Sequence, residues 1–220
     1  MGLGAETRRR IAKRAAQEIT EGMIVNLGIG IPTLVADYLK PELGVMLHTE
    51  NGILGMGPSP DEGTEDGHLS NAGGYPVTLI PGASYFDSAT AFGIIRKGYL
   101  DMTILGALEV SEEGDIANWI VPGKRVPGMG GAIDLAQKAK KVIVLMNHTN
   151  KDGGSKIVHQ CRLPLTVQKG AHMIITEMAV FQVNEDGLEL IEIMHPYTLD
   201  EIENATEATF KVSRTLTINS

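Results

Sequence analysis

Short, continuous apolar runs recur along this chain, and helical patterns lie between several of them. Such runs are typical of strands buried on both faces, because a half-exposed strand alternates polar and apolar residues. Parallel strands need crossover connections, which the intervening helices can provide. The pattern predicts an α/β fold with an open, largely parallel sheet and helices on both faces. The predicted strands are 23–27, 45–49, 77–80, 102–105, 142–146 and 173–176.

Helical periodicity accounts for much of the sequence between these strands. Near the N-terminus, Ile11, Ala15 and Ile19 recur at helical spacing beside charged residues, which predicts an amphipathic surface helix. Pro32 suits the first turn of a second helix, where its missing N–H costs nothing. Helices are predicted at 32–40, 87–97, from 132 onward and around 200–205.

The C-terminal third has a different pattern. Two apolar segments, 179–183 and 188–193, flank the turn-forming residues 184–187, which end in glycine. This arrangement is typical of a β-hairpin and predicts an antiparallel edge of the sheet. No repeat or long linker divides the 220 residues, so we expect a single domain over 1–220.

Composition excludes several classes of protein. A formal net charge of −8 argues against a nucleic-acid binder, which needs lysine and arginine to neutralise phosphates. No apolar run approaches the roughly 20 residues of a membrane helix. Cys161 is the only cysteine, which fits a reducing, cytoplasmic setting. The basic cluster at 8–14 could indicate a transit peptide or a surface anchor, but interspersed glutamates favour an ordinary helix.

Polar residues that follow a buried strand are candidates for a site, because open parallel sheets bind ligands at the carboxyl ends of their strands. At the first such end, Asn26, Gly28 and Gly30 could let the backbone approach an anionic group at a helix N-terminus. Thr33 stands where a dinucleotide site needs a third glycine, which disfavours nicotinamide binding. A tight turn without any ligand is an equally open interpretation.

At the second strand end, Glu50 follows an apolar strand and precedes Asn51 and Gly52. A carboxylate at a strand mouth can be partly desolvated, which makes it a candidate nucleophile. Since Asn-Gly is also a strong hairpin signal, a turn flanked by a solvated acid is the alternative. His48 would share a strand face with Glu50 and could tune its charge, although a packed histidine is the more usual case.

A third candidate is the glycine cluster that includes Gly128, Gly130 and Gly131. Consecutive backbone N–H groups at such a turn can form a nest for an oxyanion or a phosphate. Lys124 and Arg125 add positive charge beside it. Close packing explains the glycines equally well. The sequence contains no Walker loop, GxSxG elbow or HExxH zinc motif, and it predicts no metal site.

Several motifs follow one another along the chain. They are Asn26-Leu-Gly-Ile-Gly-Ile-Pro, Thr49-Glu-Asn-Gly-Ile-Leu-Gly-Met-Gly-Pro, Asn71-Ala-Gly-Gly, Pro81-Gly-Ala-Ser-Tyr-Phe-Asp-Ser, Ala117-Asn-Trp-Ile-Val-Pro-Gly-Lys and Gly128-Met-Gly-Gly-Ala-Ile-Asp. Taken in this order, they resemble the B (beta) subunit of 3-oxoacid and acetate–acetoacetate coenzyme A transferases. The resemblance extends from about residue 6 to 212, and it implies a fold shared with ribose-phosphate isomerases.

The resemblance implies that Glu50 attacks an acyl-CoA and carries CoA as a glutamyl thioester, with ping-pong kinetics. It implies that the Gly130 and Gly131 amides stabilise the oxyanion, while Asn26, Gly28, Gly30 and Asn51 border the CoA site. No cofactor is expected, because the CoA thioester is a substrate. The expected partner is a separate A subunit of the transferase, giving a hetero-oligomer, such as a heterotetramer of A2B2 composition, that acts on short-chain acids.

One position departs from the family pattern. Succinate-using relatives usually carry a lysine after Asn-Ala-Gly, whereas this chain has Gly74. The departure argues against succinate as the preferred acid. Two alternatives remain open on the sequence: a non-catalytic CoA or sugar-phosphate binding module of the same fold, and a sugar-phosphate isomerase of related architecture.

Overall fold

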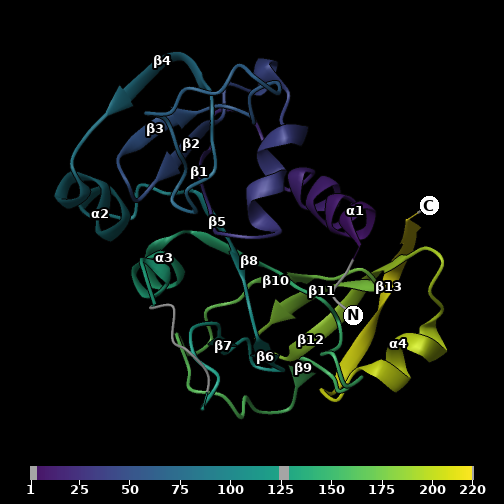
Figure 1. Ribbon diagram of the computed structural model, residues 1–220. Coiled ribbons are helices and arrows are strands. Elements are labelled where there is room, and N and C mark those ends of the chain that lie inside the picture. Colours follow the sequence, from purple (N-terminus) through teal and green to yellow (C-terminus); the bar gives the residue numbers. More distant parts are fainter. Residues whose placement is uncertain (1–3, 124–128, 220) are drawn as a thin grey trace.

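A computed structural model describes residues 4–123 and 129–219 of the chain. In this part, ten strands form one sheet in the order β13-β12-β11-β10-β8-β5-β1-β2-β3-β4, as Figure 1 shows. These are β1 (Ile24–Leu27), β2 (Met46–Thr49), β3 (Ile53–Met56), β4 (Leu79–Tyr85), β5 (Met102–Gly106), β8 (Lys141–Leu145), β10 (Met173–Ile175), β11 (Ala179–Asn184), β12 (Gly187–Met194) and β13 (Phe210–Asn219). A smaller sheet joins β7 (Ile116–Ala117), β6 (Glu109–Ser111) and β9 (Ile157–Val158).

The centre of the large sheet is parallel, as predicted. Strands β10, β8, β5, β1 and β2 pair in parallel with one another. Their residues are almost all buried because helices cover both faces. The predicted hairpin is also confirmed: β11 and β12 are antiparallel and turn at 184–187. Beyond it, β13 returns parallel to β12, a strand that the sequence did not predict.

The opposite edge of the sheet differs from the prediction. The segment 77–80 was expected as a strand of the parallel sheet, but β4 begins two residues later and pairs antiparallel with β3. Strand β3 itself was not predicted. It pairs antiparallel with β2 across a tight turn at 50–52, so the chain reverses there instead of crossing over. The sheet therefore has antiparallel strands near both edges around a parallel centre.

The predicted helices are present, with one change of type. The helix α1 spans Ala5–Ala16, α2 spans Ser88–Arg96, α3 spans Ala132–Lys138 and α4 spans Leu199–Ala205. The Asp87 side chain caps α2 by accepting from the Thr90 amide, and Thr198 and Glu201 form a capping box on α4. The segment predicted at 32–40 is 3₁₀-helical over Pro32–Tyr38 (η1), followed by Pro41–Leu43 (η2). No helix in the described residues is long and apolar enough to cross a membrane.

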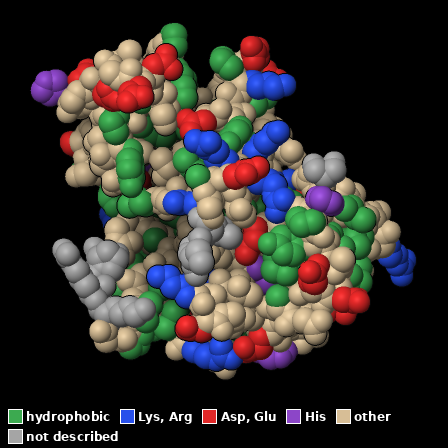
Figure 2. Space-filling model, turned by 45° about the vertical axis from the view of Figure 1, so that its right-hand side comes forward, with side chains coloured by type: hydrophobic (Ala, Val, Ile, Leu, Met, Phe, Trp, Pro, Cys, Tyr) green, Lys and Arg blue, Asp and Glu red, His purple; other side chains and the backbone are tan. Residues whose placement is uncertain are grey.

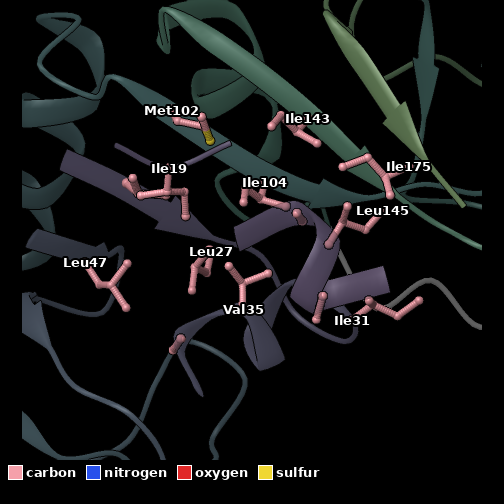
Figure 3. Packing of buried hydrophobic residues seen from close by; sticks show 14 of the residues in the cluster. Ile19, Leu27, Ile31, Val35, Leu47, Met102, Ile104, Ile143, Leu145 and Ile175 are labelled. Carbon is pink, nitrogen blue, oxygen red and sulfur yellow. The ribbon is translucent and has the colours of Figure 1, made fainter. Parts of the chain in front are cut away.

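Each face of the sheet has its own apolar core. On one face, α1 and η1 cover Val25, Leu27, Met102 and Ile104 (Figure 3). On the other, α2 and α3 lie side by side over Leu105 and its neighbours, as Figure 1 shows. Alternate residues of β1 and β5 point to opposite faces, so Asn26 and Thr103 lie on the α2 and α3 side. Asn26 and Thr103 can therefore contact polar groups on that face and not on the α1 face.

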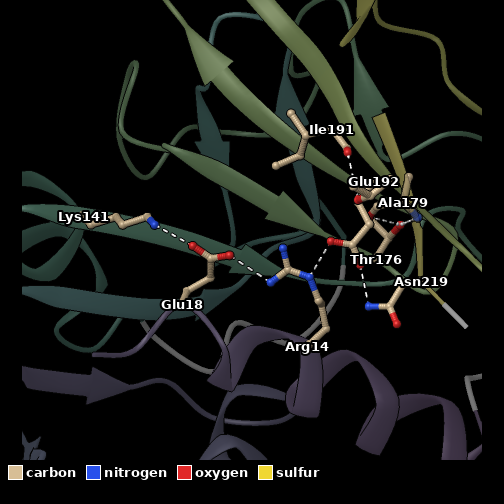
Figure 4. A network of polar contacts seen from close by, with 9 residues as sticks. Arg14, Glu18, Lys141, Thr176, Ala179, Ile191, Glu192 and Asn219 are labelled. Carbon is tan, nitrogen blue, oxygen red and sulfur yellow. Dashed lines mark hydrogen bonds and ion pairs between the residues drawn. The ribbon is translucent and has the colours of Figure 1, made fainter. Parts of the chain in front are cut away.

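The N-terminal helix is also tied to the sheet by a buried charge network (Figure 4). Arg14 of α1 donates to Glu18 at 2.8 Å and to Glu192 of β12 at 2.7 Å. Lys141 of β8 donates to the other oxygen of Glu18, also at 2.8 Å. On the face shown in Figure 2, acidic and basic side chains are interspersed instead of forming one charged patch.

Candidate active site

Glu50 lies in the tight turn that joins β2 to β3. Gly52 in this turn has φ of +112°, a conformation that favours glycine. A Cβ atom on Gly52 would lie 2.1 Å from the Phe86 carbonyl oxygen, so no other residue fits without moving the backbone. The Ile53 amide donates to the Thr49 hydroxyl at 3.1 Å and closes the turn. The hairpin interpretation was therefore right about the turn, and the turn holds Glu50 partly buried.

Asn26 contacts Glu50 from the neighbouring strand. Its side-chain Nδ2 donates to Glu50 Oε2 at 3.3 Å and to the His48 carbonyl oxygen at 3.1 Å. The Asn26 side chain is fully buried at the end of β1. A neutral amide thus orients the carboxylate without neutralising its charge.

Gly131, at the start of α3, lies on the other side of the Glu50 carboxylate from Asn26. A Cβ atom on Gly131 would lie 3.2 Å from Glu50 Cγ, 3.3 Å from Oε1 and 3.3 Å from Phe92 Cζ. A side chain at position 131 would therefore press on the carboxylate and the Phe92 ring, a crowding that glycine avoids. Arg96 of α2 holds the start of α3 in place by pairing with Asp134 of α3 and lying over the Phe92 ring.

These groups border one cavity of about 750 Å³. Such a volume suits a small ligand or the end of a longer one. The floor is formed by the ends of β1 and β5, and the walls by the Glu50 turn and the start of α3. Its lining includes Leu27, Gly28, Ile29, Glu50, Asn51, Ala72, Phe92, Leu105, Gly106, Ala107, Leu108, Asn118, Met129, Gly130, Gly131, Ala132 and Leu135.

The structure brings most of the predicted site residues together. Gly28, Glu50, Asn51, Gly130 and Gly131 all line this cavity, and Asn26 reaches it through Glu50.

Gly30 is the exception among the predicted residues. It lines a separate cavity of about 320 Å³ between α1, η1 and the 71–77 loop, with Arg8 and Arg9 at its rim. Lys124 and Arg125, predicted to add positive charge, lie outside the described residues.

In the part of the chain that the structure describes, the Glu50 carboxylate has no cationic partner. Within residues 4–123 and 129–219, no lysine, arginine or histidine forms an ion pair with Glu50. A carboxylate that is held only by an amide keeps its electron density available for attack. The described residues also contain no cluster of metal-binding side chains.

His48 does not tune Glu50 through a direct bond. Its ring is fully buried, stacks on Phe86 with centroids 5.9 Å apart, and has no hydrogen-bond partner on either nitrogen among the described residues. Burial lowers the pKa of His48, with a weaker opposing contribution from the Ala91 backbone, so the ring is neutral at pH 7. The hypothesis of charge tuning therefore has no contact to support it.

Several site residues were not predicted from the sequence. Phe92, Leu105 and Asn118 line the cavity, and Thr103 bonds to Asn26. Asn118 falls inside one of the family motifs, which could have indicated it. Thr103 gave one local signal, as the single hydroxyl in the apolar strand β5.

Comparison with known proteins identifies the family of the chain. Residues 8–203 match the coenzyme A transferase family model. The chain is 58% identical over 212 residues to the beta chain of a probable coenzyme A transferase of Bacillus subtilis, covering 96% of this chain and 98% of the relative. It is 53% identical to the B subunit of a probable succinyl-CoA:3-ketoacid coenzyme A transferase of the same organism, covering 96% and 98%.

A solved structure extends the comparison. An acyl-CoA transferase of Escherichia coli O157:H7, in a thioester complex with CoA, superposes with a TM-score of 0.73 at 28% identity. The alignment covers 97% of this chain but only 43% of that enzyme, so this chain spans less than half its length. The fold and the site define an α/β protein built around a glycine-flanked carboxylate. This chain belongs to the coenzyme A transferase family.

Proposed function

We propose that this chain is the B subunit of a coenzyme A transferase, and that Glu50 carries CoA between short-chain or 3-oxo carboxylic acids. The observation that carries the proposal is the position of Glu50. Its carboxylate is partly buried, receives one amide hydrogen bond from Asn26, lies against the Gly131 backbone and opens into a cavity.

In the proposed reaction, the Glu50 carboxylate attacks the thioester carbonyl of an acyl-CoA. CoA leaves as the thiolate, and a mixed anhydride of Glu50 and the acyl group forms. The thiolate then attacks the Glu50 carbonyl, releases the first acid and leaves a glutamyl-CoA thioester. A second carboxylate reverses the two steps and departs as the new acyl-CoA. Atoms and charge balance without a metal or a redox cofactor.

The glycines at the start of α3, Gly130 and Gly131, suit this chemistry. Each attack places negative charge on a carbonyl oxygen, and in this proposal backbone N–H groups at the start of α3 would stabilise that charge. Loss of such a donor typically costs about 3 to 4 kcal/mol of barrier. Gly130 and Gly131 are the proposed donors, while Gly28 and Asn51 would border the pantetheine arm of CoA.

A partner chain is part of the proposal. The relatives that this chain spans almost completely are named as beta or B subunits, whereas the longer Escherichia coli enzyme includes a further segment in one chain. We infer an A subunit that covers the open side of the Glu50 cavity. Hetero-oligomers of A2B2 composition would follow.

The preferred acid is proposed from one position. Gly74 has φ of +78° and carries no side chain in the loop that approaches Ile29 at the cavity. A cation for the distal carboxylate of succinate is therefore missing at this position. We expect monocarboxylates and 3-oxo acids to be better acceptors than succinate.

The test is to trap the intermediate. The chain, assembled with its A subunit, is mixed with an acyl-CoA, quenched rapidly, and examined by mass spectrometry for CoA on the peptide that contains Glu50. Borohydride should reduce the thioester, and Glu50→Ala should show no adduct while still assembling. Retained turnover by Glu50→Ala, or tight CoA binding by the wild type with neither adduct nor exchange, would overturn the proposal.

A further inference from the structure

A row of polar side chains crosses three neighbouring strands directly beneath Glu50. In the sheet register, Asn26 of β1 pairs with His48 of β2 on one side and with Thr103 of β5 on the other. Residues paired in this way point to the same face of a sheet. All three side chains are fully buried, on the face that also carries the apolar cluster around Leu105.

Two successive hydrogen bonds lead from Thr103 to Glu50. The Thr103 hydroxyl donates to Asn26 Oδ1 at 3.3 Å, and Asn26 Nδ2 donates to Glu50 Oε2, also at 3.3 Å. The same Nδ2 donates to the His48 carbonyl oxygen. A chain of bonds thus runs from β5 through the end of β1 to the carboxylate.

The direction of the Asn26 amide follows from its surroundings. The His48 carbonyl and an ionised Glu50 are both acceptors only, so the NH₂ end of the amide must face them. The Oδ1 end is then turned toward β5, where it needs a donor. Within the described residues, the Thr103 hydroxyl is that donor. A flipped amide would place two oxygens against each other at Glu50.

Strand preference alone does not explain Thr103. Valine has nearly the same shape, favours strands equally and avoids burying a hydroxyl. The adjacent residues of β5 are apolar, and the register partner in β8 is Val142. The hydroxyl therefore has one described polar contact, which is Asn26.

We propose that Thr103 is a positioning residue for Glu50, which acts by fixing the Asn26 amide so that its NH₂ group holds the reacting carboxylate. This inference rests on the proposed function for its catalytic consequence, but the orientation of Asn26 is measurable without any activity.

The kinetic test compares Thr103→Val with Thr103→Ser in the assembled enzyme. Without the hydroxyl, kcat and the single-turnover rate of thioester formation should fall about 10-fold to about 100-fold with little change in KM, because a misplaced nucleophile affects the chemical step. Thr103→Ser should restore both. Ser111→Ala removes another buried hydroxyl, which does not line the cavity, and should leave kcat unchanged. Wild-type rates in Thr103→Val, or no rescue by serine, would refute the proposal.

A double-mutant cycle tests the route through Asn26. If Thr103 acts only by holding that amide, Thr103→Val should have almost no further effect on kcat in an Asn26→Ala background. Independent and additive losses would contradict the proposed route.

A second measurement does not depend on transferase activity. In the full chain with isotope-labelled asparagine, the side-chain amide of Asn26 should exchange its hydrogens slowly in wild type and in Thr103→Ser, and faster in Thr103→Val. Equal exchange in all three would overturn the role of Thr103 even if thioester formation is found. If the wild type forms no thioester, the proposed function fails, while this exchange measurement still decides what Thr103 does.

Discussion

Two buried or partly buried carboxylate sites lie on opposite faces of the same sheet, and they are built in opposite ways. On the α1 side, Glu192 and Glu18 are each bonded to Arg14, and Glu18 is also paired with Lys141 (Figure 4). On the α2 side, Glu50 has an amide from Asn26 and no ion pair among the described residues. The first site compensates every charge, whereas the second leaves its charge exposed to a cavity.

The pKa of Glu18 illustrates the compensated design. Burial alone would raise it, but hydrogen bonds and positive charge from Lys141 and Arg14 outweigh burial and lower it. A carboxylate stabilised in this way links structural elements through ion pairs and is a poor nucleophile. A buried carboxylate that is surrounded by cations thus joins structural elements, whereas one that is held by an amide beside a cavity is free to meet a ligand, as we propose for Glu50.

The greatest change in stability is expected when Arg14 is removed from the site that contains Glu18 and Glu192. Arg14→Met should lower the free energy of unfolding by about 3 to 5 kcal/mol, because Glu192 and part of Glu18 lose their cation while buried. Urea unfolding of the full chain measures this change. Lys13→Met, on the exposed side of the same helix, should change stability by less than about 0.5 kcal/mol.

The activity of folded Arg14→Met, assembled with its partner, should match the wild type. Glu50→Gln should show the reverse behaviour, with normal urea unfolding and no transfer. A large stability loss in Glu50→Gln, or none in Arg14→Met, would contradict the conclusion that the ion-paired site stabilises the fold and the Glu50 site does not.

A pH dependence is expected from a third buried polar group, His148, which follows β8. Its two ring nitrogens lie 3.0 Å and 2.9 Å from the hydroxyls of Thr176 and Thr206. Burial, with a smaller contribution from the Lys156 charge, lowers the pKa of His148 to about 4. The unfolded chain therefore binds a proton below about pH 6.5 that the folded chain does not.

It follows that stability falls as the pH drops from about 6.5 toward about 4, by about 2 kcal/mol between pH 7 and pH 5 for this group. In His148→Gln that part of the pH dependence should disappear, as measured by urea unfolding at the two pH values. Equal slopes for wild type and variant would show that His148 is not responsible.

A smaller effect is expected from a methyl group at Gly131, beside Glu50. Gly131 has φ of −82°, which alanine also adopts, so Gly131→Ala keeps the backbone N–H. Its methyl group would press on Glu50 and Phe92 and displace the carboxylate by a few tenths of an ångström. We expect kcat to fall about 10-fold with unchanged unfolding.

Gly93→Ala in α2 is the matched control, because its methyl group would meet open space and should leave kcat unchanged. Full activity in Gly131→Ala would show that the close approach of this glycine to Glu50 has no catalytic importance.

Local sequence patterns predicted the parallel centre of the sheet, the C-terminal hairpin and most helix positions, and the ordered motifs indicated the family. Buried strands and capped helices leave local signals, and the ordered motifs singled out Glu50 and the glycines at 130 and 131. The second antiparallel edge left one signal, the turn at Asn51 and Gly52, whereas β3 itself was missed because it is only four residues long and includes Gly55.

Which of the predicted residues contact one another depends on the tertiary structure. Thr103, Asn26 and Glu50 belong to segments far apart in the chain and become neighbours because β5 and β2 pair with the two sides of β1. Gly131 reaches Glu50 because α3 packs beside α2 over that face, while Gly30 faces a different cavity. Strand order is set by long-range burial, which local periodicity does not encode. The contacts that distinguish the amide-bonded Glu50 from the ion-paired Glu18 and Glu192 therefore appear only in the folded chain.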